Sequence, residues 1–382
     1  MKICMIGGTG TISLSISQLL LSQGHTLYLL NRGQRSSYME ERTSSQDTPQ
    51  TGTPVPTGRL VWLKADIGEE EKVQKLLDGL KTDPTLSGSP GAPDDGRAGM
   101  PGGLQFDVVA DFIAFTPEQL MRDWRLFQGR TRQFVFISSA SAYQKPLSDY
   151  RINEGTPLAN PYWEYSRNKI ACEEYLMELY REKGFPVTIV RPSHTYDERS
   201  VPLGVHGQQG SYAILKRMLE GRPVIIHGDG TSLWTLTHSS DFARAFVGLL
   251  GNIHAIGEAV QITSDESLTW NQIYQIIADA LGVKLHAIHV ASQFLDASSD
   301  YDFAGSLLGD KANTVVFDKA KLKRLVPGFT ATVRADQGLR SCVEYILSPP
   351  ECQREDPAFD AWCDRVVSAM ETAVQAVRGI RS

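Results

Sequence analysis

Residues 2–13 read KICMIGGTGTIS, and this stretch decides the fold of the chain. Its first five residues form a short β-favouring run, and a glycine-rich turn at 7–13 follows at once. Beyond the turn, apolar residues recur at helical spacing until Gly24, which is placed to end a helix. TLYLLNRG (26–33) then predicts a second strand. Strand, turn, helix and strand in this order form a βαβ unit, which predicts a parallel sheet with right-handed crossovers.

The same alternation continues along the chain. Further strands are predicted at 59–67, 106–114, 132–140 and 186–192, with helical patterns between them. Strands that alternate with helices favour an α/β fold built on a doubly wound parallel sheet.

The glycine-rich turn is typical of a phosphate-binding loop. Gly7 and Gly10 allow a tight turn and a close approach of the backbone to a pyrophosphate, and the following helix directs its positive N-terminus at that anion. The third glycine of the usual pattern is replaced by Ser13, a small residue whose hydroxyl is able to cap the helix. Because the loop follows a strand and opens a helix, we expect a dinucleotide site here. The remaining expected loop contacts are Thr9, Thr11 and Ile12.

The end of the second strand distinguishes NADP from NAD. An acidic residue there binds the ribose hydroxyls of NAD, whereas an arginine accommodates the 2′-phosphate of NADP. The chain has Asn31, Arg32 and Arg35 instead of a carboxylate, so NADP is favoured and NAD is the alternative, with Arg35 equally well a solvated loop charge. Asp66 and Ile67 end the third strand beside the expected adenine, and Asp66 alternatively caps the next helix.

Three polar residues suit hydride transfer at a hydroxyl or carbonyl carbon. Tyr165 and Lys169 are spaced i and i+4 on a predicted helix and therefore share one face. A phenol has a pKa of ~10, and a nearby ammonium is expected to lower it toward the neutral range. Ser139, at the end of the strand at 132–140, supplies a hydroxyl that would polarise the substrate oxygen.

With these motifs in place, the sequence resembles the extended short-chain dehydrogenase/reductase family in its epimerase/dehydratase-like group, atypical members included. The resemblance covers residues 1–345 apart from two insertions. It implies a Rossmann-type sheet with a smaller, discontinuous C-terminal substrate domain. It also implies an NAD(P)-dependent oxidoreductase or epimerase that acts on a hydroxyl/carbonyl carbon of a small, sugar-like molecule.

The resemblance assigns roles to individual residues. It implies that Tyr165 is the acid-base group, that Lys169 is its partner and a ribose ligand, and that Ser139 is the polarising hydroxyl. Pro192 and Ser193 match the segment that lines the nicotinamide carboxamide in the family. Relatives dimerise through helices that flank this tyrosine, which leaves a homodimer open.

The sequence departs from the family pattern at two places that concern the substrate. Ala140 and Ser141 follow Ser139 where the sugar 4,6-dehydratases carry an Asp-Glu pair, so elimination of water is not expected. Trp234 stands where an arginine would hold a nucleotide-sugar diphosphate, so it is expected either to stack on a substrate ring or to pack in the core. The other residues expected to line the substrate pocket, each with core packing as the alternative, are Tyr143, Trp163 and His194.

The pattern divides the chain into three parts. Residues 1–195 are expected to form the dinucleotide-binding domain, interrupted at 43–58 and 82–103 by segments dense in Pro, Gly, Ser and Thr that predict mobile surface insertions. Residues 196–345 are expected to form mainly the substrate domain, with some segments returning to the core. Residues 346–382 predict a helical tail whose amphipathic helix packs on the body.

Composition excludes several classes of protein. The chain has 382 residues and a net charge of -6, which disfavours a nucleic-acid binder. It has no apolar run of the ~18 residues that a membrane span needs and no signal-peptide pattern. Its five cysteines show no paired spacing and its eight histidines are scattered, which predicts no metal site and favours the reducing cytoplasm.

A second class of function remains open at this stage. The chain could be a cofactor-binding sensor without catalysis, or an RNA-binding member of the atypical branch. The intact Ser139, Tyr165 and Lys169 favour an enzyme with a small-molecule substrate.

Overall fold

A computed structural model describes residues 1–33, 58–80 and 105–379 of the chain. Arg35 and both predicted insertions, apart from Gly58, lie outside the described residues. None of the helices described combines the length and the apolar character that crossing a bilayer requires.

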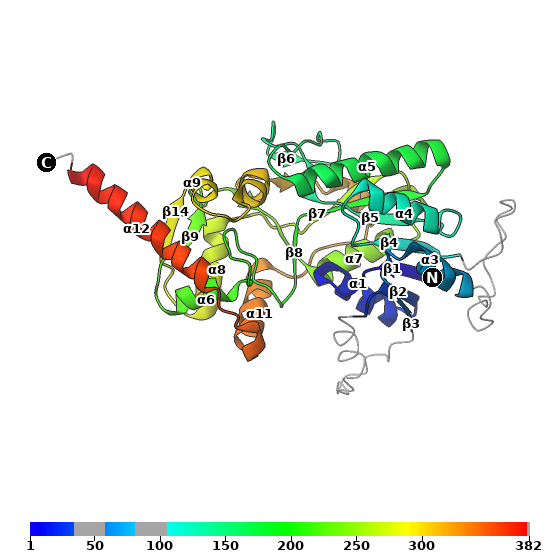
Figure 1. Cartoon of the computed structure of the whole chain (residues 1–382), viewed down its shortest axis with the longest axis horizontal. Coiled ribbons are helices and arrows are strands. Elements are labelled where there is room, and N and C mark those ends of the chain that lie inside the picture. Colours follow the sequence, from blue (N-terminus) through cyan, green and yellow to red (C-terminus); the bar gives the residue numbers. More distant parts are fainter. Residues whose placement is uncertain (34–57, 81–104, 380–382) are drawn as a thin grey trace.

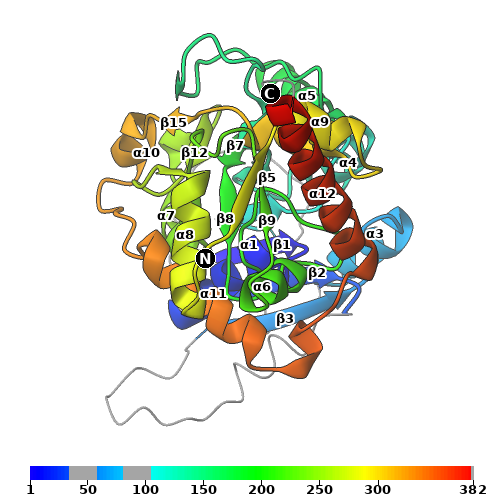
Figure 2. The same cartoon turned by 90° about the vertical axis from the view of Figure 1, so that its left-hand side faces the viewer.

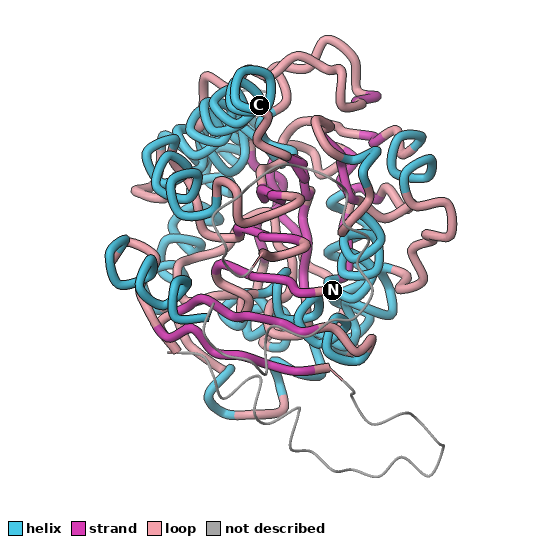
Figure 3. Tube along the Cα trace, turned by 90° about the vertical axis from the view of Figure 1, so that its right-hand side faces the viewer, coloured by secondary structure: helices cyan, strands magenta, loops and turns pink. Residues whose placement is uncertain are grey.

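A parallel sheet forms the centre of the molecule (Figure 3). In the described ranges it has seven strands in the order β12-β7-β5-β4-β1-β2-β3. The direction of winding reverses between β1 and β4, so the predicted doubly wound α/β fold is confirmed. The strands are β1 (Lys2–Ile6), β2 (Thr26–Asn31), β3 (Arg59–Lys64), β4 (Val108–Asp111), β5 (Phe134–Ile137), β7 (Val187–Pro192) and β12 (Ala259–Ile262).

Helices cover the sheet on both sides (Figure 1) and bury apolar side chains against it. On one side, α1 (Thr11–Ser22) and α7 (Ser239–Leu249) bury side chains such as Ile16 and Phe246 against β1 and β4. On the other side, α3 (Glu70–Gly79), α4 (Pro117–Phe127) and α5 (Glu164–Lys183) bury side chains such as Leu120 and Leu176. Successive side chains of a strand point to opposite faces of the sheet. Because helices cover both faces, the central strands are apolar along almost their whole length.

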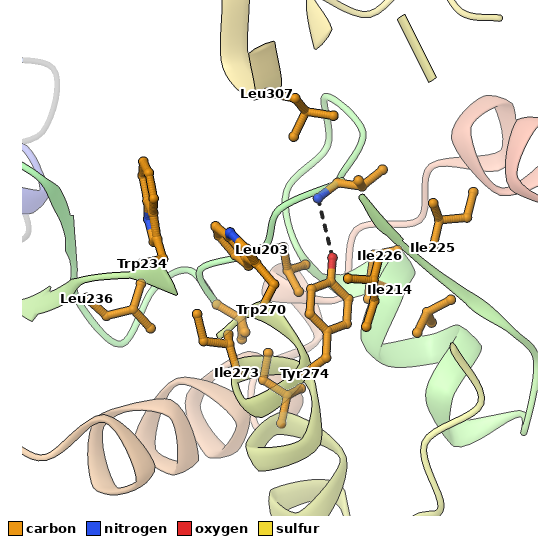
Figure 4. Packing of buried hydrophobic residues seen from close by; sticks show 14 of the residues in the cluster. Leu203, Ile214, Ile225, Ile226, Trp234, Leu236, Trp270, Ile273, Tyr274 and Leu307 are labelled. Carbon is orange, nitrogen blue, oxygen red and sulfur yellow. Dashed lines mark hydrogen bonds between the residues drawn. The ribbon is translucent and has the colours of Figure 1, made fainter. Parts of the chain in front are cut away.

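A second lobe faces the viewer in Figure 2. It has its own cluster of buried apolar residues. In it Trp270 and Tyr274 are fully buried, and the Tyr274 hydroxyl accepts a hydrogen bond of 3.3 Å from the Val205 amide, the dashed line in Figure 4. Its longer elements are α6 (Tyr212–Leu219), β9 (Val224–His227), α8 (Trp270–Leu281), β14 (Ala287–Val290), α9 (Ser292–Ala297), α11 (Ala335–Leu347) and α12 (Pro357–Gly379).

The remaining described elements are short. The described short strands and helices are β6 (Arg151–Ile152), β8 (His194–Tyr196), β10 (Leu233–Trp234), β11 (Leu236–His238), β13 (Leu268–Thr269), β15 (Val316–Phe317) and α10 (Ala320–Leu325). The 3₁₀ turns are η2 (Ala140–Ala142), η3 (Ile253–Ala255) and η5 (Pro350–Cys352), and η4 (Ala304–Lys311) is a π-helix. β12 joins the main sheet beside β7, although the domain division at residue 195 itself stays a prediction.

The predicted tail helix forms as α12, but only its first half packs as expected. Phe359, Trp362 and Val366 are buried against the second lobe, whereas Val374 is 47% exposed. The last turns extend away from the body, at the left of Figure 1. The amphipathic pattern therefore predicted the helix correctly. The part of the helix that packs on the body is shorter than the pattern predicted.

Candidate active site

The glycine-rich loop lies at the carboxyl end of β1. Gly7 and Gly8 have φ angles of +104° and +89°, in the left-handed region that side chains rarely adopt. A Cβ on Gly8 would lie 2.5 Å from a methyl carbon of Leu29, so the backbone of the loop lies directly against the sheet. The Gly7 amide donates to the Leu30 carbonyl at 3.0 Å. Glycine therefore stands at the two positions where the backbone conformation and the close approach to the sheet exclude a side chain.

Ser13 stands at the position of the third glycine and adds a hydrogen bond that glycine could not form. Its buried hydroxyl accepts a hydrogen bond of 2.9 Å from the Gly10 amide, the N-cap residue of α1. The predicted capping of the helix by this hydroxyl is therefore present.

A groove with a volume of about 850 Å³ runs along the carboxyl ends of β1 to β4, next to the point where the sheet reverses its winding. Ligands of doubly wound folds bind at this position. Nine of the predicted cofactor contacts line it: Gly7, Thr9, Gly10, Thr11, Ile12, Asn31, Arg32, Asp66 and Ile67. Residues that the sequence did not indicate also line it, mainly from the β4–α4 segment: Phe112, Ile113, Phe115, Gln119 and Arg122.

The end of β2 carries one bracing residue and one exposed cation. The Asn31 side chain donates to the Gly7 carbonyl and accepts from the Gly33 amide, both at 2.9 Å, so it stabilises the loop. The Arg32 side chain is 64% exposed, and its guanidinium lies 4.0 Å from the Asp66 carboxylate. Asp66 also accepts from the Gly68 amide at 2.9 Å, in the turn that leads into α3. Asp66 lines the groove, which is compatible with the predicted adenine contact, but it does not cap α3, whose N-cap residue is Glu69.

A second cavity of about 370 Å³ opens beyond the end of β5. The groove and this cavity adjoin there, because Ile137 lines the groove and Ser139 lines the cavity. Predicted site residues that line the cavity are Ser139, Trp163, Tyr165, Pro192, Ser193, His194 and Trp234.

Hydrogen bonds orient the Ser139 hydroxyl. It lies 2.8 Å from the Ser141 hydroxyl and accepts from the Ser141 amide at 3.1 Å. The Ser166 hydroxyl donates to the same Ser141 oxygen at 2.7 Å, which ties the turn to α5. Tyr165, one residue earlier on α5, is half-buried, and its ring lies 4.9 Å from the Trp163 ring.

Lys169 is buried on α5, four residues after Tyr165. Its buried ammonium donates hydrogen bonds of 2.7 Å to the Ala114 and Ile137 carbonyls and lies 4.6 Å from the centre of the Phe115 ring. Burial lowers the pKa of Lys169 to about 8. This lysine therefore joins the ends of β4 and β5.

The pKa of Tyr165 differs from the sequence-based prediction. Burial raises the pKa of Tyr165, and a side-chain hydrogen bond with Ser139 acts in the opposite direction. The predicted lowering by Lys169 is wrong for this structure, because the ammonium is directed at two backbone carbonyls and its Nζ lies 5.8 Å from the centre of the Tyr165 ring.

Tyr143 does not line the cavity, so this part of the prediction is wrong. It is fully buried, its hydroxyl donates to the Gln261 side chain at 2.9 Å, and the Arg191 guanidinium lies 4.9 Å from its ring centre. Arg191 in turn forms a buried ion pair of 2.6 Å with Glu173. The core alternative stated for Tyr143 is the one that the structure shows.

His194 and Trp234 form one polar contact inside the cavity. The indole Nε1 of Trp234 donates to Nδ1 of His194 at 3.4 Å. Burial lowers the pKa of His194 to about 3, so the imidazole is neutral and accepts this bond. Trp234 also packs against Trp270, with 5.8 Å between ring centres, which is the predicted core packing, and stacking on a substrate ring stays a prediction.

Two charged residues of the cavity were missed. Lys145 follows the Ser139 turn, and Asp310 comes from η4, far away in the sequence. The only sequence signal for Asp310 was a carboxylate next to a small, apolar stretch, AGSLLGDK (304–311). Val315 and Phe317 complete this side of the cavity.

Comparisons with known proteins agree with this geometry. The model of the NAD dependent epimerase/dehydratase family matches residues 119–263. The 2'-dehydrokanamycin reductase of Streptomyces kanamyceticus is 28% identical over 195 residues, 51% of this chain and 54% of that protein. The chloroplast stem-loop binding protein of 41 kDa b from Arabidopsis thaliana is 25% identical over 281 residues, 74% of this chain and 63% of that protein. The matches thus span between 54% and 63% of the length of these two relatives.

A solved structure shares the fold. The dTDP-glucose 4,6-dehydratase from Bacillus anthracis str. Ames, in complex with NAD, superposes with a TM-score of 0.64 at 18% identity and covers 92% of this chain and 98% of its own. The relatives include proteins named as epimerases, dehydratases and reductases. In its motifs and in these matches, the chain is similar to the NAD dependent epimerase/dehydratase family, whose model covers residues 119–263.

Proposed function

We propose that this chain is an NAD(P)-dependent oxidoreductase or epimerase that acts on a hydroxyl/carbonyl carbon of a small, sugar-like molecule. One observation carries the proposal. Ser139 and Tyr165 line a cavity that adjoins the glycine-loop groove at the end of β5. A substrate in the cavity would therefore lie next to a dinucleotide in the groove.

The groove fits a nicotinamide dinucleotide. The loop at Gly7 and Gly8 has no side chain that would hinder a pyrophosphate, and α1 begins directly behind it. The exposed Arg32, and not a carboxylate, directly follows Asn31 at the end of β2, which supports NADP over NAD. When bound, the nicotinamide would supply or accept the hydride.

The residues of the chain would move the proton. Tyr165 donates it to, or takes it from, the substrate oxygen, and Ser139 donates a hydrogen bond to the same oxygen. The short bonds from Lys169 to two strand ends use two of its three protons, which leaves one for a ribose hydroxyl.

Replacement of the tyrosine tests the acid-base role. Tyr165→Phe is expected to keep cofactor binding and to lower kcat by at least ~100-fold, since general acid-base catalysis typically contributes that much. The measurement is consumption or formation of NADPH with a panel of ketosugars and matching alcohols. Tyr175→Phe, on the same helix but outside both cavities, is the matched control and should keep full turnover. Equal turnover in Tyr165→Phe and the control would contradict the proposal.

A second candidate function follows from one relative. The stem-loop binding protein matches 74% of this chain in sequence, against 51% for the 2'-dehydrokanamycin reductase. The net charge of -6 disfavours strong binding to phosphate backbones. Titration of a fluorescent RNA hairpin at physiological salt separates the two functions. Tight hairpin binding together with normal cellular function of Tyr165→Phe would favour the non-catalytic candidate.

A further inference from the structure

The substrate cavity contains two opposite charges that are not paired with each other. Lys145 is 3% exposed, and Asp310 lines the same cavity. Among the described residues, neither the Lys145 ammonium nor the Asp310 carboxylate forms a side-chain hydrogen bond or an ion pair within 4.0 Å. Buried polar groups without partners are costly and are commonly completed by a ligand.

The fold positions Asp310 firmly. It lies on the π-helix η4, a type of element that occurs frequently at functional sites. The Asn160 side chain donates both to the Gly309 carbonyl at 2.7 Å and to the Ser141 carbonyl at 2.8 Å, so it links η4 to the Ser139 turn. Gly305 packs so closely on Trp163 that a Cβ there would lie 2.3 Å from the indole.

These contacts bring the carboxylate close to the reacting groups. The negative charge of Asp310 contributes to the raised pKa of Tyr165. Burial raises the pKa of Asp310 to about 6, and the nearby charges of Lys145 and Lys311 act to lower this pKa. Lys311 is buried outside the cavity lining, and burial lowers its pKa, as it also lowers that of Lys145.

We propose that Lys145 and Asp310 bind hydroxyl groups of an uncharged, polyhydroxylated substrate. Asp310 accepts a hydrogen bond from one hydroxyl, and Lys145 donates to another. The inference rests on the proposed function, because it names the substrate class of the same cavity.

The charge distribution favours an uncharged ligand over two charged ones. A phosphate would face the Asp310 carboxylate, and an ammonium would face Lys145. Among the described residues, no arginine lines the cavity or the hollow next to it at 146–150 and 312–314, where Asp149 adds a second carboxylate. A sugar diphosphate would therefore lack the bidentate partner that such a group needs.

Saturation-transfer NMR on the NADPH-loaded full chain tests this inference. The probes are methyl α-D-glucopyranoside, D-glucosamine and UDP-glucose. We expect the strongest transfer to the uncharged glucoside. Asp310→Asn and Lys145→Gln should each reduce that signal at least ~5-fold, because each removes a charge-assisted hydrogen bond. Asp279→Asn, which removes an exposed carboxylate on α8, is the matched control and should leave the signal unchanged.

Conservative variants guard against misfolding. Asp310→Glu and Lys145→Arg keep the charges and should retain more of the signal than Asp310→Asn and Lys145→Gln. Stronger transfer to glucosamine or UDP-glucose, no transfer to the glucoside, or an unchanged signal in Asp310→Asn would each overturn the inference. NADPH titration of the same samples separates the two proposals, since loss of cofactor binding would contradict the proposed function itself.

Discussion

Ser13 and Asn31 show how single side chains shape the cofactor groove. The Ser13 hydroxyl accepts a hydrogen bond from the Gly10 amide. The Asn31 carboxamide forms hydrogen bonds to both Gly7 and Gly33, so the two side chains stabilise the glycine loop. Arg32, in contrast, has within residues 1–33, 58–80 and 105–379 a 4.0 Å contact with the exposed Asp66 carboxylate. It is therefore the described residue at the end of β2 that is best able to select a cofactor.

The first residue-scale prediction concerns Arg32. Arg32→Ala should weaken NADPH binding by about 10-fold, the value of one charge-assisted hydrogen bond to phosphate, and should change NADH binding by less than about 2-fold. Fluorescence titration of both nucleotides measures this. Arg334→Ala, which removes an exposed arginine that lines neither cavity, is the control. Equal weakening of NADPH and NADH would show that Arg32 does not read the 2′-phosphate.

The second residue-scale prediction concerns His194. Burial lowers the pKa of His194 to about 3, from an ordinary value of 6.5. The unfolded chain then binds more protons than the folded one between these values, so stability is lost as the pH falls below 6.5. His194→Gln should reduce the pH dependence of the unfolding free energy by about 1 kcal/mol per pH unit between pH 6 and 4.5. Urea unfolding at several pH values measures it, and identical slopes in variant and wild type would contradict the assignment.

At the scale of elements, short turns decide which residues reach the cavity. After β5 the chain enters the 3₁₀ turn η2, capped by the Ser139 side chain. This turn leaves Ser139 at the cavity and directs Tyr143 into the core. Strand periodicity carries no information about side-chain direction after such a turn, so the sequence left Tyr143 open between the pocket and the core, and the structure shows the core.

The element-scale prediction concerns the contact between η4 and α5. Gly305→Ala would place a methyl group 2.3 Å from the Trp163 indole, so η4 must move away from the cavity wall. We expect a loss of about 1–3 kcal/mol in the free energy of unfolding, as for other overpacked sites. Gly328→Ala is the matched control, because a Cβ there meets nothing within 4 Å. Equal denaturation midpoints for the two variants would show that η4 is not held by this contact.

At the scale of the whole molecule, the sequence predicted what depends on local order. The βαβ start, the glycine loop and the Tyr165–Lys169 spacing follow from neighbours along the chain, and the doubly wound sheet is confirmed. Lys145 and Asp310 could not be paired in advance, because only tertiary folding brings η4 beside the Ser139 turn. The direction of the Lys169 ammonium likewise depends on two strand ends that meet in space.

The most direct test of the central claim is nucleotide binding by the intact chain. The purified protein is denatured, any released nucleotide is identified by mass spectrometry, and the emptied protein is titrated with NADPH and NADH. Retained cofactor at one per chain would favour an epimerase that recycles its hydride, whereas reversible binding with NADPH preferred would favour a reductase. Either result agrees with a dinucleotide site at the Gly7–Ser13 loop. If neither nucleotide is released or bound, the loop is only a turn, and the proposed function is wrong.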